Sequence, residues 1–409
     1  MSLLTELQKA SDAVTVTLTP RPAGITATTA ATPLTLEVCA PEQRATVMAH
    51  WKSLEATLAP VALSCTYDWV DAWLNHYGDQ IPHQFVVARR GSILRAVLLL
   101  TADLTDRQAM LRINTWHFGT AGELDCDSVC VEYNDWLCAP EEREAVLEAL
   151  VTSTDARLAC DRWQFDGVAA IDLPDTVSSA NDWRCDRRVA RYLDLHEIRE
   201  SRRELITFFG DSTRKHIRQN LRDYGQVDVE WTDTVSAAHA VFDEQIALHQ
   251  QRWRSVGEPG CYSSAVFTAF HRELIDRLVP KQLMTVVGVR AGGQTLGCSQ
   301  LLFDRNRVLV YQGGRNPNAG KLSPGLITDY QCMLECLRRG YDAFDFMAGD
   351  SLHKQRMTTH TAPLVWAEKR QPGWKLPLLD AVQKCRQTLR SWLGRHAAAH
   401  PSLMGSKED

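Results

Sequence analysis

The sequence predicts an α/β protein with mixed α+β sheets, in which two domains each carry a mostly antiparallel sheet flanked by helices. Three observations predict it. The chain has 409 residues, which corresponds to two or three domains of ordinary size. Its second half reads as helices, an antiparallel meander, a helix and a strand, and its first half repeats that order. With 44% apolar residues, the chain can bury full-sized cores without disulfide or metal support.

We expect four parts along the chain. Residues 1–33 are rich in Thr, Ala and Pro and have few large side chains, so they are expected to form a disordered leader. The first domain is expected at residues 34–196 and the second at residues 197–375. A helix followed by a polar tail is expected at residues 376–409.

In the first half, apolar periodicity and turn residues place the elements in order. The glycine of Arg90-Gly91-Ser92 joins two apolar runs and predicts a hairpin. A helix from Glu141 to Leu158 carries acids in its first turn, as the helix dipole favours. The expected strands are Leu34–Val38, Gln84–Arg89, Ile93–Leu100, Leu111–Phe118, Val129–Glu132 and Trp163–Phe165, and the other helices are Glu42–Leu58 and Tyr67–Tyr77.

In the second half, one long helical region is expected from Ser201 to Tyr224, where Gly225 ends it. A hairpin turn is expected at Gly292-Gly293, and Gly340 is expected to cap the last helix. The other expected helices are Ser236–Arg254, Ser264–Leu278 and Gly325–Arg339, and the strands are Val227–Trp231, Leu283–Arg290, Thr295–Phe303, Arg307–Gln312 and Ala343–Met347.

The composition excludes several classes of protein. Fifty acidic and 45 basic residues give a net charge of −5, so no stable nucleic-acid partner is expected. Neither an apolar run of about 20 residues nor a secretory signal occurs, which predicts a cytoplasmic protein without a transmembrane segment. The 12 cysteines follow no metal-binding spacing, because Cys126, Cys130 and Cys138 lack a second pair or a His pair. No metal is expected.

The loop before the helix at Gly325 could bind an anion. Ser323 is a suitable helix cap, and Pro324 suits the first helical position. Free N–H groups and the positive end of the helix dipole favour a phosphate or pyrophosphate there, and Lys321 adds a positive charge. The alternative is that the Gly and Pro residues of this loop only turn the chain.

A series of short patterns keeps a fixed order between about residues 200 and 356. They are Lys215–Gly225, Leu248–Trp253 with the pattern Leu-His-x-x-Arg-Trp, Phe270-His271, Ser323-Pro324-Gly325, Gly340, Phe344-Asp345-Phe346 and a Lys-containing loop. In this order the sequence resembles the GNAT superfamily of acyl-CoA N-acyltransferases, specifically its two-domain CelD-like branch linked to exopolysaccharide synthesis. The first half resembles that branch only in its element order.

The resemblance implies tandem GNAT-like domains and acyl-CoA as a cosubstrate. It implies that the Ser-Pro-Gly loop takes the place of a Gly-rich pyrophosphate loop. It also implies that the strand Val308–Gln312 supplies N–H groups to the acyl carbonyl, where they stabilise the oxyanion. The residues expected to bind the cofactor are Gln312, Gly313, Lys321, Ser323, Gly325 and Leu326.

Four residues are candidates for acid–base catalysis. Asp345 lies between two phenylalanines in an apolar strand, and His249 lies on the inward-facing stripe of its helix. His353 stands where relatives often carry the tyrosine that protonates the departing thiolate, and Asp350 lies on the same loop. Imidazole titrates near neutral pH, which suits proton removal from an ammonium group. For the buried His and Asp, the alternative is a structural hydrogen-bonding role.

Substrate binding is expected from basic and aromatic side chains on two helices. Arg214, Arg218 and Arg222 recur every four residues, which fits either a solvated helix face or a site for CoA phosphates, a sugar phosphate or an RNA end. Arg252 is expected to join that site, and Trp253 is expected to stack on a sugar. The predicted substrate-binding set is therefore Arg218, Arg222, Arg252 and Trp253.

Three functions remain open at this point. The first is an acyl-CoA-dependent N-acyltransferase acting on an amine of a sugar or another small polar acceptor. The second is an aminoacyl-tRNA-dependent transferase resembling the Fem family, which shares the tandem architecture but would need a basic tRNA-facing surface. The third is a non-catalytic GNAT scaffold, which the absent tyrosine favours. The acyl chain, the acceptor and the oligomeric state stay open.

Overall fold

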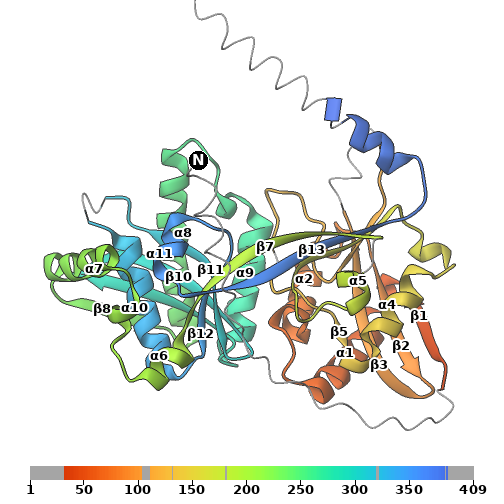
Figure 1. Cartoon of the computed structure of the whole chain (residues 1–409), viewed down its shortest axis with the longest axis horizontal. Helices are drawn as coiled ribbons and strands as arrows, with labels where there is room; N and C mark the ends of the chain where they lie inside the picture. Colours follow the sequence, from red (N-terminus) through yellow and green to blue (C-terminus); the bar gives the residue numbers. More distant parts are fainter. Residues whose placement is uncertain are drawn as a thin grey trace, which may run out of the picture. The chain divides into compact units, whose positions relative to one another are not determined.

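A mixed sheet of 13 strands runs through the described part of the chain, with helices on both of its faces (Figure 1). The computed structural model describes residues 32–103, 111–130, 132–179, 182–318, 322–382 and 384–385. From Leu34 onward these residues form one compact unit. Most of the expected leader, the expected polar tail and Lys321 lie outside the described residues.

The first half contributes a meander, a crossover helix and a parallel strand. The helix α2 has the predicted bounds, Tyr67–Tyr77, and the side chain of Thr66 caps it by accepting from the N–H of Trp69. The strands are β1 Leu34–Cys39, β2 His83–Arg90, β3 Ile93–Ala102, β4 Thr115–Phe118, β5 Leu137–Cys138 and β6 Arg162–Ala169, and the other helices are α1 Arg44–Leu58, α4 Arg143–Val151 and α5 Asp175–Ser179. Strand β6 runs parallel to β4.

The second half repeats this order. Its first hairpin turns through Gly292 and Gly293, whose φ angles of 55° and 77° suit the tight turn that matches strand twist. The strands are β8 Val227–Trp231, β9 Met284–Ala291, β10 Gln294–Asp304, β11 Arg307–Arg315 and β12 Ala343–Ala348, and the helices are α6 Leu195–Ser201, α7 Asp211–Tyr224, α8 Val235–Ser255, α9 Ala265–Leu278, α10 Pro324–Arg339 and α11 Leu352–Met357.

Two long strands join the halves, and neither was expected from the sequence. The strand order is β1-β2-β3-β4-β6-β13-β7-β12-β11-β10-β9-β8, where β7 is Trp183–Asp194 and β13 is His360–Arg370, and β5 pairs with β3 beside this path. Strand β13 pairs with β6, and β7 pairs with β12, so the last strand of each half lies in the sheet of the other (Figure 1). The domain division expected at residue 196 stays a prediction.

Three expected elements are wrong, and local backbone geometry explains two of them. The helix expected from Ser201 to Tyr224 is interrupted, because Arg202 ends α6 in the left-handed conformation and α7 begins only after Gly210. No strand forms at residues 129, 130 and 132, since Cys130 and the following Tyr133 have φ angles of 45° and 56°, which an extended strand does not allow. The helix expected to reach Leu158 ends at Val151.

In the second half, helices pack against both faces of the sheet. Helices α8 and α9 share a hydrophobic core with one face of β9 and β10, and α6, α7 and α10 share another core with the opposite face. Side chains alternate across a strand, so Cys298 and Leu302 of β10 enter the first core and Leu301 and Phe303 the second. None of the described helices is long and apolar enough to cross a membrane.

Candidate active site

The parallel strands β11 and β12 pair only where they begin. Their register is Arg307 with Ala343, Val308 with Phe344 and Leu309 with Asp345. Beyond Leu309, β11 continues along β10 and β12 continues along β7. The facing edges of the two strands therefore separate, and their main-chain groups have no partner strand there. Such groups are strong hydrogen-bonding sites for a ligand.

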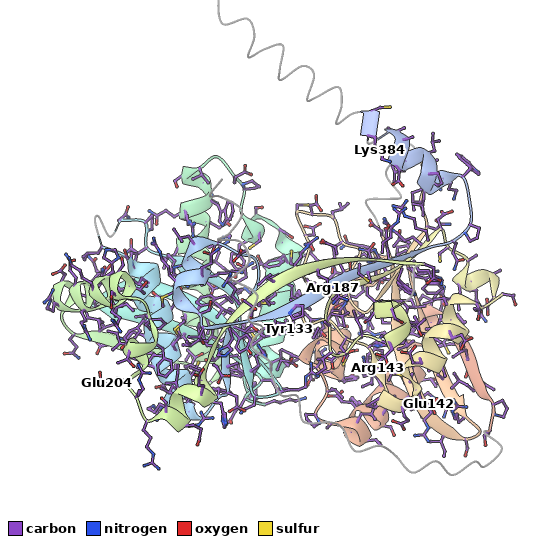
Figure 2. All side chains as sticks on the ribbon, viewed as in Figure 1. Tyr133, Glu142, Arg143, Arg187, Glu204 and Lys384 are labelled. Carbon is purple, nitrogen blue, oxygen red and sulfur yellow. The ribbon has the colours of Figure 1, made fainter. Side chains whose placement is uncertain are left out.

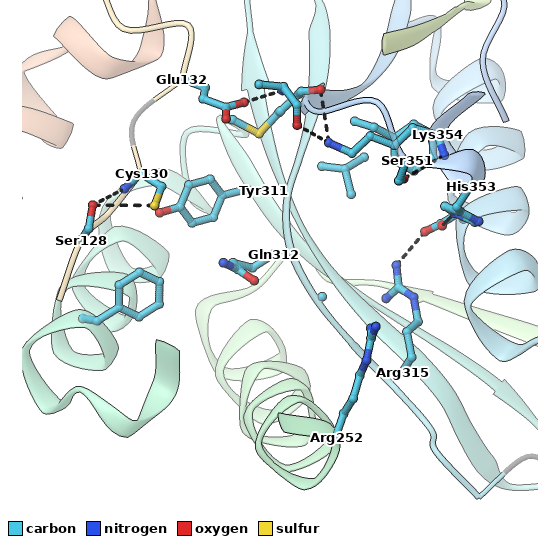
Figure 3. Close-up of a pocket in the computed structure, with 17 residues that line it drawn as sticks. Ser128, Cys130, Glu132, Arg252, Tyr311, Gln312, Arg315, Ser351, His353 and Lys354 are labelled. Atoms are coloured by element: carbon cyan, nitrogen blue, oxygen red, sulfur yellow. Dashed lines mark hydrogen bonds and ion pairs between the residues drawn. The ribbon is translucent and has the colours of Figure 1, made fainter. Parts of the chain in front are cut away.

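A cavity of about 520 Å³ fills the opening between the two strands (Figure 3). Its wall includes β11 from Val310 to Gly313 and the end of β12. Helices α8 and α9 line it from one face of the sheet, and α10 and α11 line it from the other. Ser128, Cys130 and Glu132 of the first half complete the wall. Two substrates could therefore meet across the strands from opposite faces.

A buried carboxylate on α10 orients two cavity residues. Asp329 accepts a hydrogen bond from Nη2 of Arg315 at 2.6 Å, and its other oxygen lies 2.8 Å from Nε2 of His353. Burial opposes ionisation of Asp329, but the charge of Arg315 and the contact with His353 outweigh it and hold the pKa below its usual range. Asp329 therefore stays ionised and fixes the ring of His353 at the cavity wall.

An acid and a base meet the end of β12. Glu132 accepts a hydrogen bond of 2.6 Å from the N–H of Ala348, while Nζ of Lys354 donates to the carbonyls of Met347 and Ala348 (Figure 3). Burial raises the pKa of Glu132, against the Ala348 N–H and the charge of Lys354. Burial also lowers the pKa of Lys354. Both groups are therefore shifted toward their neutral forms, as is frequent in sites for proton transfer.

Asp345 lies outside this cavity, although it is fully buried. Its Oδ2 accepts hydrogen bonds of 2.5 Å from the hydroxyl of Tyr133, labelled in Figure 2, and from Nη1 of Arg307. Its Oδ1 accepts from the N–H of Met347 at 2.6 Å. Burial raises the pKa of Asp345, against the charge of Arg307. These contacts fit the structural hydrogen-bonding role that was the alternative for Asp345.

The other two candidate catalytic residues also lie outside the cavity wall. Asp350 is exposed, and its carboxylate pairs with Arg191. His249 is buried on α8 beside Cys261 and Gln250. Among the four candidates, His353 alone lines the cavity.

The residues expected to bind the cofactor fall into two groups. Gln312 and Gly313 line the cavity. Ser323, Gly325 and Leu326 lie at the start of α10 and do not line it, and the N–H of Ser323 donates to Oδ1 of Asn220 at 2.7 Å. One amide of the expected anion site is thus occupied by the side chain of Asn220. Lys321 lies outside the described residues.

The expected substrate-binding residues are similarly divided. Arg252 lines the cavity, and Trp253 lies beside His249 with 5.9 Å between ring centroids. Arg218 and Arg222 are exposed on α7. Sequence reasoning missed Glu132, Arg315, Asp329 and Lys354. Arg315 and Lys354 lie within the stretch of residues 200–356 that the sequence resemblance covers, but Glu132 lies outside it and carries no comparable signal.

A separate group of ligand-type side chains lies at the junction of β7, α6 and β13. Asp194, Glu197 and His360 each offer one atom, and these atoms lie within 4.8 Å of one another. Asp194 already caps α6 by accepting from the N–H of Glu197 at 2.7 Å. These groups suit a metal ion chemically, but helix capping accounts for the position of Asp194.

Residues 211–355 match the family model of the acetyltransferase (GNAT) domain. The match runs from α7 into α11 and includes both separated strands, so it covers the cavity walls that come from the second half. No curated protein matches the chain. The CelD-like branch stays a prediction.

The chain is similar to solved structures at low sequence identity, and two of them, with TM-scores of 0.54 and 0.50, show the fold. FemX is 11% identical with a TM-score of 0.54, over 82% of this chain and 98% of that one. A C-terminal DUF2156 domain described as belonging to a lysylphosphatidylglycerol synthetase from Agrobacterium fabrum is 12% identical with a TM-score of 0.50, over 83% and 96%. A tandem GNAT protein from the clavulanic acid biosynthesis pathway is 12% identical with a TM-score of 0.41, over 84% and 100%. The predicted mixed α/β, GNAT-like fold class is confirmed.

Proposed function

We propose that the protein transfers an acyl group from acyl-CoA to an amine of a sugar or another small polar acceptor. The observation that carries this proposal is the cavity between β11 and β12, which is lined from both faces of the sheet and bordered by an unpaired strand edge. A thioester and an amine that enter this gap from opposite faces of the sheet would meet at the strand edge. A role in polysaccharide synthesis rests on the sequence resemblance alone.

The strand edge would stabilise the transition state. As the amine attacks, the thioester carbonyl becomes an oxyanion, and fixed N–H groups of β11 between Val310 and Gly313, which border the cavity, would donate to it. An ammonium group has three donors, of which Lys354 directs two to the carbonyls of Met347 and Ala348. The third N–H of the Lys354 ammonium would bring its positive charge beside the oxyanion.

Two cavity residues suit the proton transfers. Glu132 would remove the proton from the attacking ammonium, because its carboxylate lies on the cavity wall and its raised pKa makes it a stronger base than an exposed carboxylate. His353, held by Asp329 at 2.8 Å, would give a proton to the departing thiolate. The ionised carboxylate of Asp329 orients the ring of His353 for this step.

One cation on the cavity wall suits the phosphates of the donor. Arg252 has no ion-pair partner among the residues that the structure describes, whereas Arg315 is committed to Asp329. An unpaired guanidinium can bind a phosphate through two parallel hydrogen bonds. We therefore assign Arg252, rather than Arg315, to the nucleotide end of the donor.

Ligand-dependent melting tests the proposal. Acetyl-CoA or CoA binds only the folded chain, so millimolar ligand should raise the melting temperature by mass action. The Arg252→Ala variant should show a smaller shift. No shift at millimolar ligand, together with no CoA release in the presence of amino sugars, would contradict the proposal.

A Fem-like aminoacyl-tRNA-dependent transferase is the second candidate. It is supported by the exposed arginines of α7, Arg218 and Arg222, and its fold is compatible with the similarity to FemX. Binding of tRNA through phosphate contacts would weaken steeply with salt. Salt-dependent tRNA binding without any CoA-dependent melting shift would favour this second function over the first.

A further inference from the structure

A cysteine, a histidine and a glutamine form a chain of contacts beside the cavity. Sγ of Cys261 lies 3.6 Å from Nε2 of His249. On the other side of the ring, Nδ1 of His249 lies 3.2 Å from Oε1 of Gln250. The amide nitrogen of Gln250 donates to the carbonyl of Pro259 at 2.8 Å. The order is thiol, imidazole and orienting amide, the arrangement of a nucleophile with its base.

The direction of each hydrogen bond follows from one group that can only accept. The carbonyl of Pro259 has no proton to give, so Gln250 must direct its NH₂ group there and its oxygen toward His249. That oxygen takes the proton of Nδ1. The neutral ring therefore carries no proton on Nε2, which is free to accept one from the thiol of Cys261.

The backbone brings these groups together through a glycine. Gly260 has φ of 70°, and a Cβ there would lie 2.4 Å from Oε1 of Gln250 and 3.2 Å from Cε1 of His249. Only glycine fits this close approach without strain. The chain leaving α8 is thus turned back over its own last turns, and Cys261 is placed directly on the ring of His249.

The pair is neutral at rest and reachable from outside. Burial raises the pKa of Cys261 to about 12, against backbone N–H groups of Cys261 and Tyr262 that favour the thiolate. Burial also lowers the pKa of His249, and the charge of Arg252 adds to this effect. Cys261 is nevertheless only half-buried. His249 can therefore remove the thiol proton during an attack, as a general base does, rather than before it.

Cys261 itself does not line the cavity, but neighbouring residues connect it to the cavity wall. The ring of Tyr262 packs on His249 at 4.9 Å and on Phe267, a cavity residue, at 5.5 Å. Arg252, which also lines the cavity, comes from the same last turns of α8 as His249 and Gln250.

We infer that Cys261 and His249 form a nucleophile and base that take an acyl group from a thioester. Sγ of Cys261 attacks the thioester carbonyl while its proton passes to Nε2 of His249. The carbon–sulfur bond of the donor then breaks, and the departing thiolate takes this proton. The products are an S-acyl cysteine and the free thiol of the donor. For acyl-CoA as the donor, the inference rests on the proposed function.

Mass spectrometry of the full chain tests this inference with two donors. Acetyl-CoA requires the proposed donor site, whereas S-acetyl-N-acetylcysteamine is a small thioester without nucleotide. We expect each to add one acetyl group that hydroxylamine removes, located in the peptide that contains Cys261. Cys261→Ser should abolish it. Cys185→Ser is the matched control and should keep the label, because Cys185 is exposed, lies outside the cavity wall and contacts the carbonyl of Val177 rather than a histidine.

Substitution of the base, His249, should slow the acylation while the acetyl group is still found on Cys261. His249→Gln should reduce the rate of Cys261 acylation by about 100-fold, a typical contribution of a general base. Absence of label with both donors, or label on another cysteine, would overturn the inference, and mapping the unmodified chain needs no variant to fold. Labelling by the small thioester, with no CoA-dependent melting shift and no CoA release in the presence of amino sugars, would instead contradict the proposed function and leave this inference standing.

Discussion

The hydroxyl of Tyr133 donates a 2.5 Å hydrogen bond to Asp345, which lies 212 positions later in the chain. Arg307 donates to the same carboxylate oxygen at 2.5 Å, so a segment of the first half is tied to β11 and β12 where these strands separate. Asp345 thereby braces the base of the cavity. This contact also holds the neighbouring Glu132 toward the end of β12.

Removal of this hydroxyl should destabilise the protein. In Tyr133→Phe the buried Asp345 loses one of its partners, and we expect about 1–3 kcal/mol less stability in urea unfolding. Tyr192→Phe is the control, because its ring also lies over Arg307, at 4.6 Å, while its hydroxyl has no hydrogen-bond partner in the described part of the chain. Equal effects of the two changes would contradict the bracing role.

Glu132 should control the acidic side of the pH–rate profile. Because burial raises its pKa, kcat/KM should fall as the pH drops through that raised value and the base becomes protonated. Glu132→Gln should lower kcat at least 100-fold and remove this limb. Asp350→Asn should leave the profile unchanged, since Asp350 is exposed and lies outside the cavity wall. If Asp350→Asn removed the acidic limb and Glu132→Gln left it unchanged, Asp350 rather than Glu132 would be the base.

Arg252 should contribute to donor affinity, whereas its neighbour Arg254 should not. Both arginines are exposed in the last turn of α8, but only Arg252 lines the cavity. Loss of a bidentate phosphate contact costs about 1.5–3 kcal/mol, so Arg252→Ala should weaken CoA binding by roughly 10- to 100-fold in calorimetry. Equal weakening by Arg254→Ala would indicate a diffuse electrostatic effect.

A buried ion pair in the first half should make stability depend on pH. Nδ1 of His117 lies 2.7 Å from Asp166, and Asp103 is 3.7 Å from Nε2. Burial opposes the charge of His117, but Asp166 and Asp103 outweigh it and raise the pKa to about 10. The charged form of His117 therefore stabilises the folded protein fully at pH values below about 6.5, the pKa of His in the unfolded chain. This stabilisation is lost as the pH rises through 10.

His117→Asn measures this contribution. We expect the variant to be about 3 kcal/mol less stable than the parent at pH 6, because Asp166 loses its buried partner. The difference should shrink at pH 9.5. Burial raises the pKa of Glu123 to about 7 and the charge of His117 lowers it, so the loss of this favourable contact is part of the measured difference. A difference that is constant between the two pH values would show that His117 is neutral in the folded protein.

The contact between β11 and α8 should be intolerant of a methyl group. A Cβ at Gly314 would lie 2.6 Å from the carbonyl oxygen of Gln245 and 2.9 Å from Cβ of Leu248. Gly314→Ala should therefore cost about 1–3 kcal/mol, since overpacking shifts backbone. Gly373→Ala, with nothing within 4 Å of the added carbon, should stay within about 0.5 kcal/mol. If Gly314→Ala left the stability unchanged, α8 would be able to move away from β11.

Elements that depend on local sequence could be predicted, and elements that depend on distant partners could not. The helix α2 follows from its cap and apolar stripe, and the β9–β10 hairpin follows from two glycines. Strand β7 is different, because its residues 184–189 are exposed and show no apolar alternation. Only pairing with β12 and β13 makes it a strand.

The same limit applies to the site. Gln312, Gly313 and His353 lie in the segment that the resemblance covers, and all three reach the cavity. Glu132 meets Ala348 from 216 positions away, so neither residue alone indicates the contact. Cys261 reaches His249 only because Gly260 turns the backbone back over α8. Such constellations exist only after folding.

Amide hydrogen exchange of β11 tests the donor site most directly. The N–H groups between Val310 and Gly313 border the cavity, so a bound thioester should slow the exchange of that segment and of residues 346–348. We predict protection of both segments at saturating acetyl-CoA, with no change in β4 of the first half. Unchanged exchange in β11 at saturating ligand would contradict the assignment of the acyl donor to this cavity.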